Sequence, residues 1–516
     1  MATFLDLPDE IRLLIGKQLR ANSIYSCILV CRTFYSSFIS CLWSHLSVKV
    51  DSREEVNPTL IRANAHRVES LTYSAALTEG FYTIVYPRLL TLRLNSFYAD
   101  KNKPNYLAVQ PQQKVQFARM HPTVRKLTYN HKDILPKEFW EVVGEEWRDF
   151  EELEFTGTVK EGAVEAFWKS CDRVKRLDLS DVNFPESMPV LSTLSFERLR
   201  DLAILKYPWR INPAPRTWPI QLLQQVKHAR DLKRITWDVG DVAFPVQLVM
   251  DALHEGCWPS LYELSVGDPT FSDQDLAGVL GALTSRKLTA LELTRGRFGP
   301  LAYNCIRERY FDHLRDLSIG KCLGATSAMV QEILTECVHL VALDAQHIFV
   351  RDIATAQKPW VCLGLQNLAV YIVKQAEDEA AWEGLVFEQV ARLRMLRVLD
   401  LQGDPHRSYL DDEPRPHEIQ RLETLDFRLP SQDNPVDSST SSSSNIRRWS
   451  SLVQLRVISF NGDRQNLGMK EALWMTEHWR DLTCVGGDFK AAESGEFEEL
   501  RSLFSRKGIV HLPDIM

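Results

Sequence analysis

One apolar pattern recurs along most of the chain and restricts what the chain can fold into. The pattern is L-x-x-L-x-L, with other apolar residues allowed in place of leucine, and it occurs sixteen times between Val68 and Cys484. Successive copies mostly start 24 to 31 residues apart. They begin at residues 68, 89, 124, 150, 174, 199, 232, 261, 288, 314, 340, 365, 396, 422, 452 and 479. Such a spacing is typical of a protein built from stacked repeats.

Each copy suits a short strand followed by a helix. The apolar fourth and sixth positions point to one side of a strand, and the residue between them points to the other side. Helical stretches follow several copies, at 162–171, 245–257, 275–283 and 328–337. Neither element can bury its apolar side alone, so the repeats are expected to stack into a solenoid with a continuous core. The alternative is a chance spacing of leucines in another α/β protein, which sixteen regular copies argue against.

The repeats resemble the cysteine-containing class of leucine-rich repeats. In residues 314–343, LRDLSIGKCLGATSAMVQEILTECVHLVAL, Cys322 follows the strand and Cys337 precedes the next one. Cys171 and Cys257 hold the second of these positions in their own repeats. The resemblance implies an α/β fold in which a curved parallel sheet carries helices on its outer side. Many copies lack the asparagine or cysteine that the family places after the strand, so irregular loops are expected there.

The chain starts with a short apolar segment, LDLPDEIRLLIGKQL at residues 5–19. Pro8 suits the first position of a helix, and Asp9 and Glu10 suit its positive first turn. Apolar residues at intervals of four then form one stripe. A second apolar helical stretch is expected over 22–43, capped by Asn22 or Ser23. Within that stretch Cys27 and Cys31 are predicted to lie one helical turn apart on an apolar face.

This segment resembles an F-box. Its residues follow the family's sequence L-P-x-E-I, then V-C-R-x-F and L-W, over about residues 5–45. The resemblance implies that the chain binds the Skp-type adaptor of a cullin–RING ubiquitin ligase and acts as a substrate receptor without catalytic residues of its own. The adaptor-binding residues it implies are Leu7, Pro8, Glu10, Ile11, Ile15, Leu19, Ile24, Val30, Cys31, Arg32, Phe34 and Trp43. A domain of this size buries too little surface to be stable alone, which also indicates a partner.

A second interpretation stays open for these helices. They could simply cap the N-terminal end of the solenoid, in which case the chain would be a protein-binding scaffold with no link to a ligase. In either case we divide the chain into an F-box at 1–46, a connecting segment at 47–67, a solenoid of about sixteen units at 68–490 and a C-terminal cap at 491–516. The stretch GIVHLP in that cap can close the last strand.

Two surfaces are candidates for binding an unknown protein substrate. The positions between the two strand leucines share one face of the sheet, and six of the fourteen are acidic: Glu154, Asp178, Glu292, Asp344, Asp400 and Asp426. This row predicts a basic substrate segment, although acids are frequent at this position of leucine-rich repeats for structural reasons. The loop at 206–219 contains Tyr207, Trp209 and Trp218 among prolines and arginines, which is typical of a contact site. A packed lid is the alternative for that loop.

Composition excludes several other functions. The net charge is −7, from 61 Lys and Arg against 68 Asp and Glu, so neither nucleic acid nor a membrane surface is an expected partner. No apolar run is long enough to span a membrane, and acids stand where a secretory signal would be basic, which predicts a cytoplasmic or nuclear protein. Ten cysteines without a CxxC pair do not indicate a disulfide framework or a zinc site. Because no catalytic motif is present either, we expect no enzyme activity, cofactor or metal.

Overall fold

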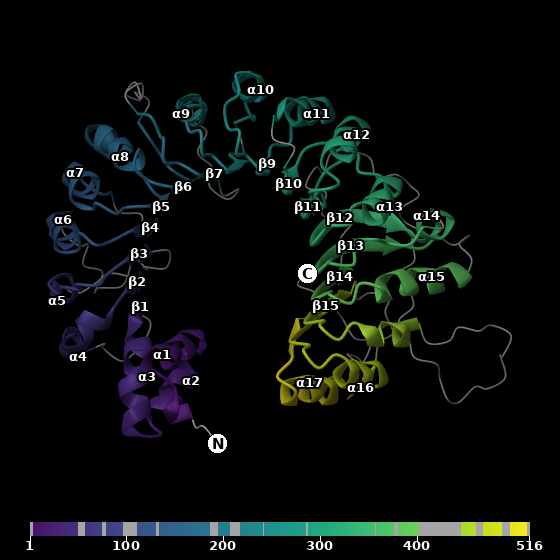
Figure 1. Cartoon of the computed structure of the whole chain (residues 1–516), viewed down its shortest axis with the longest axis horizontal. Helices are drawn as coiled ribbons and strands as arrows, with labels where there is room; N and C mark the ends of the chain where they lie inside the picture. Colours follow the sequence, from purple (N-terminus) through teal and green to yellow (C-terminus); the bar gives the residue numbers. More distant parts are fainter. Residues whose placement is uncertain are drawn as a thin grey trace. The chain divides into compact units, whose positions relative to one another are not determined.

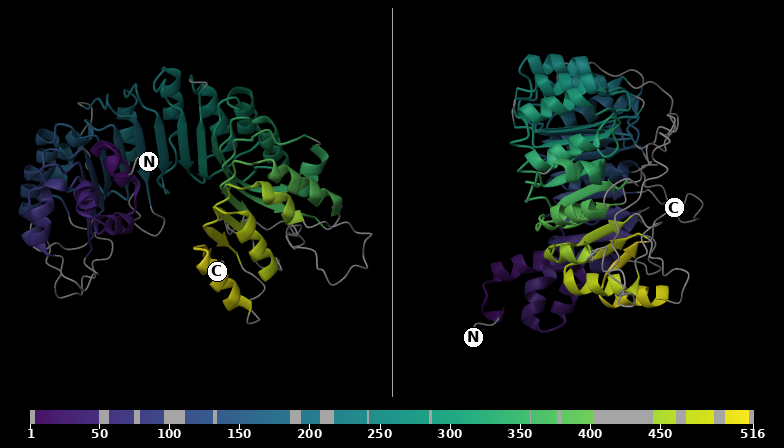
Figure 2. Two further views of the ribbon diagram at one scale, coloured as in Figure 1. Left: turned by 60° about the horizontal axis from the view of Figure 1, so that its bottom comes forward. Right: turned by 90° about the vertical axis from the view of Figure 1, so that its right-hand side faces the viewer.

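The structure is a computed structural model of the whole chain. It describes residues 4–49, 57–74, 79–95, 111–130, 134–185, 194–206, 217–240, 242–284, 287–356, 358–375, 380–401, 445–460, 468–487 and 496–512. The chain forms two compact units, Met1–Thr236 and Trp237–Met516. In each unit parallel strands lie side by side and helices cover one side of them (Figures 1 and 2). The predicted α/β repeat fold is therefore confirmed.

The first unit starts with three helices and continues as strand–helix repeats. Its helices are α1 (Asp9–Gln18), α2 (Ala21–Ile28), α3 (Arg32–Ser44), α4 (Pro58–Asn64), α5 (Glu79–Tyr82), α6 (Pro111–Met120), α7 (Lys137–Glu146), α8 (Val164–Cys171) and α9 (Trp218–Val226). Its strands are β1 (His45–Lys49), β2 (Ser70–Ser74), β3 (Thr91–Asn95), β4 (Lys126–Asn130), β5 (Glu152–Thr156), β6 (Arg176–Ser180) and β7 (Asp201–Leu205). The division between the units falls within β8 (Arg234–Asp238).

A ladder of leucines forms the core of the first unit. The fourth position of each repeat pairs in register with the same position of the next strand, and all of these side chains are buried. The ladder consists of Leu71, Leu92, Leu127, Leu153, Leu177 and Leu202. A full register of identical side chains explains why the sequence period is so regular, since a slip of one residue would turn every leucine out of the core.

The second unit continues the same repeat. Its helices are α10 (Val246–His254), α11 (Asp273–Ala282), α12 (Pro300–Arg309), α13 (Ser327–Glu336), α14 (Val350–Ala356), α15 (Ala380–Ala391), α16 (Met469–His478) and α17 (Glu496–Arg506). Its strands after β8 are β9 (Glu263–Gly267), β10 (Ala290–Arg295), β11 (Asp316–Ser318), β12 (Ala342–Phe349), β13 (Asn367–Val373), β14 (Val398–Leu401), β15 (Val457–Phe460), β16 (Cys484–Gly486) and β17 (Val510–Leu512). Among the described helices, none has the length and apolar character needed to cross a lipid bilayer.

The predicted repeat at residue 422 does not contribute a strand between its neighbours. Strand β14 pairs directly with β15, Val398 with Val457 and Leu401 with Phe460. The backbone N–H of Arg456 donates to the carbonyl of Arg397 at 2.8 Å. The predicted order, with a strand at 422 between those at 396 and 452, is therefore not what the described strands show. Residues 402–444, which include Asp426, lie outside the described part of the chain.

Strands also occur at both ends of the predicted solenoid. Strand β1 pairs in parallel with β2 and overlaps the start of the predicted connecting segment at 47–67. At the other end, β17 pairs with β16 and contains the VHL of the stretch GIVHLP, within the predicted cap at 491–516. The sheet therefore starts directly after α3, and the last strand is closed as the sequence predicted.

Buried polar groups join consecutive repeats. The thiol of Cys322 donates to the carbonyl of Leu293 in the preceding repeat, with 3.3 Å between sulfur and oxygen, and burial raises the pKa of this thiol to about 12. The indole of Trp449 donates to the carbonyl of Phe387 at 3.1 Å, and that of Trp479 donates to the carbonyl of Trp449 at 3.1 Å. These bonds give the buried thiol and indole donors an acceptor in the preceding repeat.

Candidate protein-interaction site

The three N-terminal helices form a small domain with an aromatic core. Ile24, Phe38 and Cys41 are buried, and Phe4 and Phe34 pack against them. The ring centroids of Phe4 and Phe34 lie 5.0 Å apart, and those of Phe34 and Phe38 lie 5.7 Å apart, both in edge-to-face geometry. Such pairs add to the stability given by burial alone. In Figure 2 these helices form a group of their own at the start of the first unit.

A glycine allows α1 to pack closely on α3. A Cβ atom added at Gly16 would lie 2.7 Å from the sulfur of Cys41 and 2.8 Å from a ring carbon of Phe38. Cys41 also reaches back to α1, where its thiol lies 3.8 Å from the carbonyl oxygen of Leu13. Burial raises the pKa of the Cys41 thiol, which keeps it protonated and unreactive at neutral pH.

The first helix begins one residue later than predicted. Pro8 is the residue before the helix, and its carbonyl accepts from the N–H groups of Ile11 and Arg12 at 3.1 Å each. Asp9 and Glu10 occupy the first turn as predicted, and Asp9 forms an ion pair with Arg12. Both acids lie where the helix dipole favours negative charge.

The second apolar stretch is two helices and not one. Helix α2 starts at Ala21 and has no side-chain cap, so neither Asn22 nor Ser23 plays the predicted role. The chain then turns after Leu29 and resumes as α3, with Cys31 in extended conformation just before it. Cys31 is exposed, so the predicted apolar face shared with Cys27 does not form. The turn places Leu29 and Val30 at the surface.

The twelve residues predicted to bind an adaptor fall into three groups. Leu19, Ile24 and Phe34 belong to the core of the domain, so they support the fold and do not form an outer surface. Three others, Leu7, Ile15 and Trp43, are half-buried. The exposed group consists of Pro8, Glu10, Ile11, Val30, Cys31 and Arg32.

Five exposed apolar residues of this domain were missed by the sequence reasoning. They are Leu13, Leu14, Tyr25, Leu29 and Tyr35, with exposed fractions between 37% and 68%. A single helical stripe cannot include them, because they are spread over three helices and lie outside the stripe predicted for α1. The sequence did contain a sign of these exposed residues, because the segment has more apolar residues than so small a domain can bury.

Helix α3 continues directly into the sheet of the first unit. It ends at Ser44, and β1 starts at His45. The carbonyl of Ser44 accepts from the N–H of Glu69 at 2.9 Å, and the guanidinium of Arg67 donates to the hydroxyl of Ser40 at 2.8 Å. The small helical domain and the first repeats are thus joined without a linker.

The predicted acidic positions of the first unit are compensated by neighbours. Glu154 accepts hydrogen bonds from Lys126 and from the hydroxyl of Thr128, the latter at 2.9 Å. Burial raises the pKa of Glu154, but these hydrogen bonds and the charge of Lys126 outweigh it, so the net pKa is lowered. Asp178 accepts from Ser180 at 2.9 Å, and burial raises its pKa. This part of the row offers little free negative charge.

The acidic positions of the second unit keep a different environment. Glu292 accepts from the hydroxyl of Ser265 at 3.0 Å, and Asp344 accepts from that of Ser318 at 2.8 Å. Glu292, Asp344 and Asp400 stand at one register position on every second strand from β10 to β14. Serine hydroxyl groups orient the carboxylates of Glu292 and Asp344.

Of the three aromatic residues predicted in the loop at 206–219, one lies in the described part of the chain. Trp218 is the first residue of α9, is only 5% exposed, and packs edge-to-face on Phe184 at 5.0 Å between ring centroids. It belongs to the core, so the prediction that it lies on a contact surface was wrong. Tyr207 and Trp209 lie outside the described residues.

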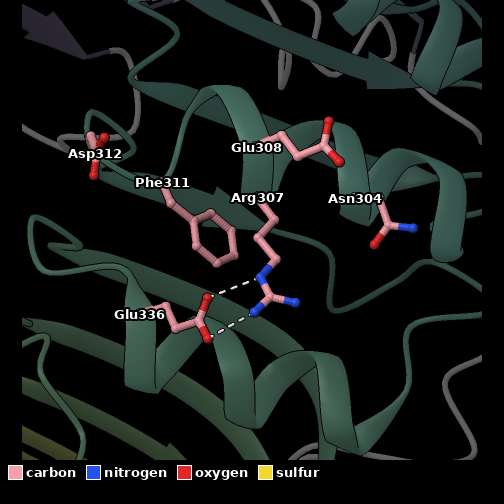
Figure 3. Close-up of a pocket in the computed structure, with 6 residues that line it drawn as sticks. All are labelled: Asn304, Arg307, Glu308, Phe311, Asp312 and Glu336. Carbon is pink, nitrogen blue, oxygen red and sulfur yellow. Dashed lines mark hydrogen bonds and ion pairs between the residues drawn. The ribbon is translucent and has the colours of Figure 1, made fainter.

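A polar hollow lies between α12 and α13, and Figure 3 shows the six residues that line it. Arg307 spans it with two hydrogen bonds of 3.0 Å to the carboxylate of Glu336. Its strongest charges are therefore already paired. Among the described residues, no group of three or more His, Cys, Asp or Glu side chains is placed to hold a metal ion.

A comparison with known protein families agrees with the assignment of the N-terminal helices to an F-box. Residues 4–49 match the family model described as F-box-like. No curated protein matches the chain. These residues are the small helical domain and the first strand, so the resemblance to an F-box followed by leucine-rich repeats is confirmed.

Three solved structures are similar to this chain at low identity. The complex of Rad7 and Elc1 in yeast matches at 13% identity over 72% of this chain and 91% of that chain, with a TM-score of 0.39. The TLR13–ssRNA13 complex matches at 13% identity over 92% of this chain and 65% of that chain, with a TM-score of 0.35. The leucine-rich repeat-containing protein LegL7 from Legionella pneumophila matches at 11% identity over 70% of this chain and 92% of that chain, with a TM-score of 0.26.

Proposed function

This chain is an F-box/leucine-rich-repeat protein, and we propose that it is the substrate-recognition subunit of an SCF-type ubiquitin ligase in the cytoplasm or nucleus. Proteins of this family are in general non-catalytic adaptors. The F-box would bind a Skp-type adaptor, and the repeats would bind the substrate protein. Holding the two together raises the effective concentration of substrate lysines near the conjugating enzyme, which requires no catalytic residue in this chain.

The exposed apolar surface of the F-box is the observation that carries the proposal. Among the described residues, 19 large apolar side chains are exposed, and seven of them fall between Ile11 and Tyr35. On α1, Ile11 and Leu14 are three residues apart and share the face turned away from Gly16 and α3. Tyr25 and Leu29 share one face of α2, and Val30 follows them in the turn. Such a concentration marks a protein–protein contact.

The capping alternative accounts for α3 only. Helix α3 touches the first repeat through Arg67, as a cap would. A cap is expected to bury its apolar residues on the sheet that it covers, but Leu14 is 58% exposed and Leu29 68% exposed. Helix α4, whose Ile61 is buried, supplies the helix of the first repeat. Helices α1 and α2 therefore need another partner to bury their outer faces.

The test is capture of a purified Skp-type adaptor by the full chain. We expect two double variants, Ile11→Asp with Leu14→Asp and Leu29→Asp with Val30→Asp, to reduce capture at least about tenfold, because burying one such side chain is worth about 2 kcal/mol. Leu301→Asp is the matched control, since Leu301 is 54% exposed on α12. Circular dichroism checks that the repeats stay folded. Equal capture by all variants, or none by the wild type, would favour the scaffold.

The repeats supply a surface for substrate in the second unit. The row of Glu292, Asp344 and Asp400 supports a basic substrate segment, because the printed partners of Glu292 and Asp344 are serine hydroxyl groups and not basic side chains. Adjacent acids of this row are two strands apart, which is about 10 Å. This separation exceeds the Debye length of about 8 Å at physiological salt, so these charges reinforce one another mainly at lower salt.

A further inference from the structure

A second charged surface, of opposite sign, lies at another place in the second unit. It is formed by the turns that lead from the helices into β12, β13, β14 and β15, at residues 337–341, 362–366, 392–397 and 452–456. The exposed arginines of these turns are Arg392, Arg394, Arg397 and Arg456. We name this surface the arginine edge. None of the four turns contains Asp or Glu.

Backbone hydrogen bonds place these side chains in rows. Each turn closes with the same bond, such as that from the N–H of Leu396 to the carbonyl of Leu393 at 2.9 Å and that from Leu455 to Leu452 at 3.1 Å. The residue after each closing leucine bonds to its counterpart in the preceding repeat. Gln366, Arg397 and Arg456 therefore occupy one register position on consecutive repeats. Arg397 and Arg456 are direct neighbours, about 4.8 Å apart along the sheet.

The arginines of the edge have no compensating partner in the described part of the second unit. Arg448 of the same region pairs with Glu388, but the guanidinium groups of Arg392, Arg394, Arg397 and Arg456 form no ion pair and no hydrogen bond there. Two like charges on adjacent strands repel each other and destabilise the sheet. A ligand with negative charge would relieve this repulsion, and the planar arginine group matches a carboxylate through two hydrogen bonds.

Exposed apolar side chains belong to the same turns as the arginines and to the two turns before them. Val338, Leu363 and Val453 occupy equivalent positions in three of the turns and are 50%, 50% and 57% exposed. Met395 is 39% exposed, and its sulfur accepts from the amide of Gln454 at 3.4 Å, which ties the β14 and β15 turns together. The surface thus combines an apolar strip with fixed positive charges.

From these rows we propose that the arginine edge binds an acidic segment of a partner protein that also carries apolar residues. Carboxylates of the segment would pair with Arg397 and Arg456, and its apolar side chains would cover Leu363, Met395 and Val453. Single-stranded nucleic acid fits less well, because proteins that bind it stack the bases on aromatic rings, and these turns contain no Phe, Tyr or Trp. The proposal does not depend on adaptor binding by the F-box.

The test measures binding of labelled peptides to the full chain by fluorescence anisotropy. The probe is a glutamate-rich peptide with interspersed leucines, and its control has glutamine in place of every glutamate. We expect the glutamate peptide to bind, and the double variant Arg397→Glu, Arg456→Glu to weaken binding at least about tenfold. Arg351→Glu, an exposed arginine on α14, should change the affinity less than about twofold. The variant Leu363→Ser, Val453→Ser should weaken binding without changing its salt dependence.

Several results would overturn the proposal. They are equal binding of the glutamate and glutamine peptides, equal losses for the Arg397/Arg456 and Arg351 variants, and absence of peptide binding by a chain with an intact circular-dichroism spectrum. Tighter binding of an oligothymidine than of the peptide would assign the edge to nucleic acid instead. The variant Ile11→Asp, Leu14→Asp should bind the peptide like the wild type, so the peptide assay and adaptor capture can fail independently.

Discussion

A buried histidine gives the first unit a stability that depends on pH. His121 is 1% exposed and follows α6. Its Nε2 accepts from the N–H of Tyr86 at 2.9 Å, and its Nδ1 lies 2.6 Å from the carbonyl oxygen of Phe117, to which it donates. Burial lowers the pKa of His121 from 6.5 to about 4. Protonation of Nε2 would also break the hydrogen bond from Tyr86, so the folded state requires the neutral ring.

The sign and size of the effect follow from this pKa. Above pH 6.5 the ring is neutral in both states, so the full stability is present. Below pH 6.5 the unfolded chain binds a proton that the folded chain does not, so stability falls until the pH reaches about 4. Between pH 7.5 and pH 5 the loss from this one group is about 2 kcal/mol.

The measurement is urea denaturation of the wild type and of His121→Gln at both pH values, followed by tryptophan fluorescence. Glutamine can accept from the N–H of Tyr86 but does not titrate. Other groups lose or gain protons equally in the two proteins, so the difference between the two pH dependences isolates His121. We expect the wild type to lose about 2 kcal/mol more than the variant between pH 7.5 and pH 5. The same loss in both proteins would refute the reasoning.

Two further predictions concern the F-box and the sheet. Gly16→Val should separate α1 from α3, because the new Cβ would overlap Cys41 and Phe38, and should destabilise the F-box by about 1–3 kcal/mol. The expected result is reduced adaptor capture with an unchanged circular-dichroism spectrum of the repeats. Gly364→Val is the control, because a Cβ there meets no atom within 4 Å. For a basic substrate, the double variant Asp344→Lys, Asp400→Lys should slow association and reduce its salt dependence. Glu154→Lys should slow association less, because Lys126 already pairs with Glu154. The measurement is the association rate at two salt concentrations.

The sequence predicted the repeats well because each of them repeats one physical requirement. Most strands bury a leucine at the fourth position, and Leu127, Leu153 and Leu177 do so in register. Repeated burial of the same residue leaves a period that can be counted. The same reasoning expected a strand at 422 between the repeats at 396 and 452, but β14 and β15 pair directly with each other.

The F-box was predicted less completely because its function depends on what is left exposed. Periodicity identifies residues that share a face, but it does not show which face meets the rest of the domain. Ile11 and Ile15 belong to one predicted stripe, yet Ile11 is exposed, and Gly16, one residue beyond Ile15, packs on Phe38. Leu14 and Leu29 were therefore overlooked, although they are among the most exposed apolar residues described.

Charge shows most clearly what sequence alone leaves undecided. The acid at position 154 and the arginines at 397 and 456 are equally visible in the sequence, and each belongs to a regular row. In the folded chain Glu154 accepts hydrogen bonds from Lys126 and Thr128, so its carboxylate is paired within the sheet. The guanidinium groups of Arg397 and Arg456 stand side by side without a partner among the described residues. Because the fold gains nothing from such a pair, the unsatisfied charges of the arginine edge mark a second place where a partner can bind, apart from the acidic row of the second unit.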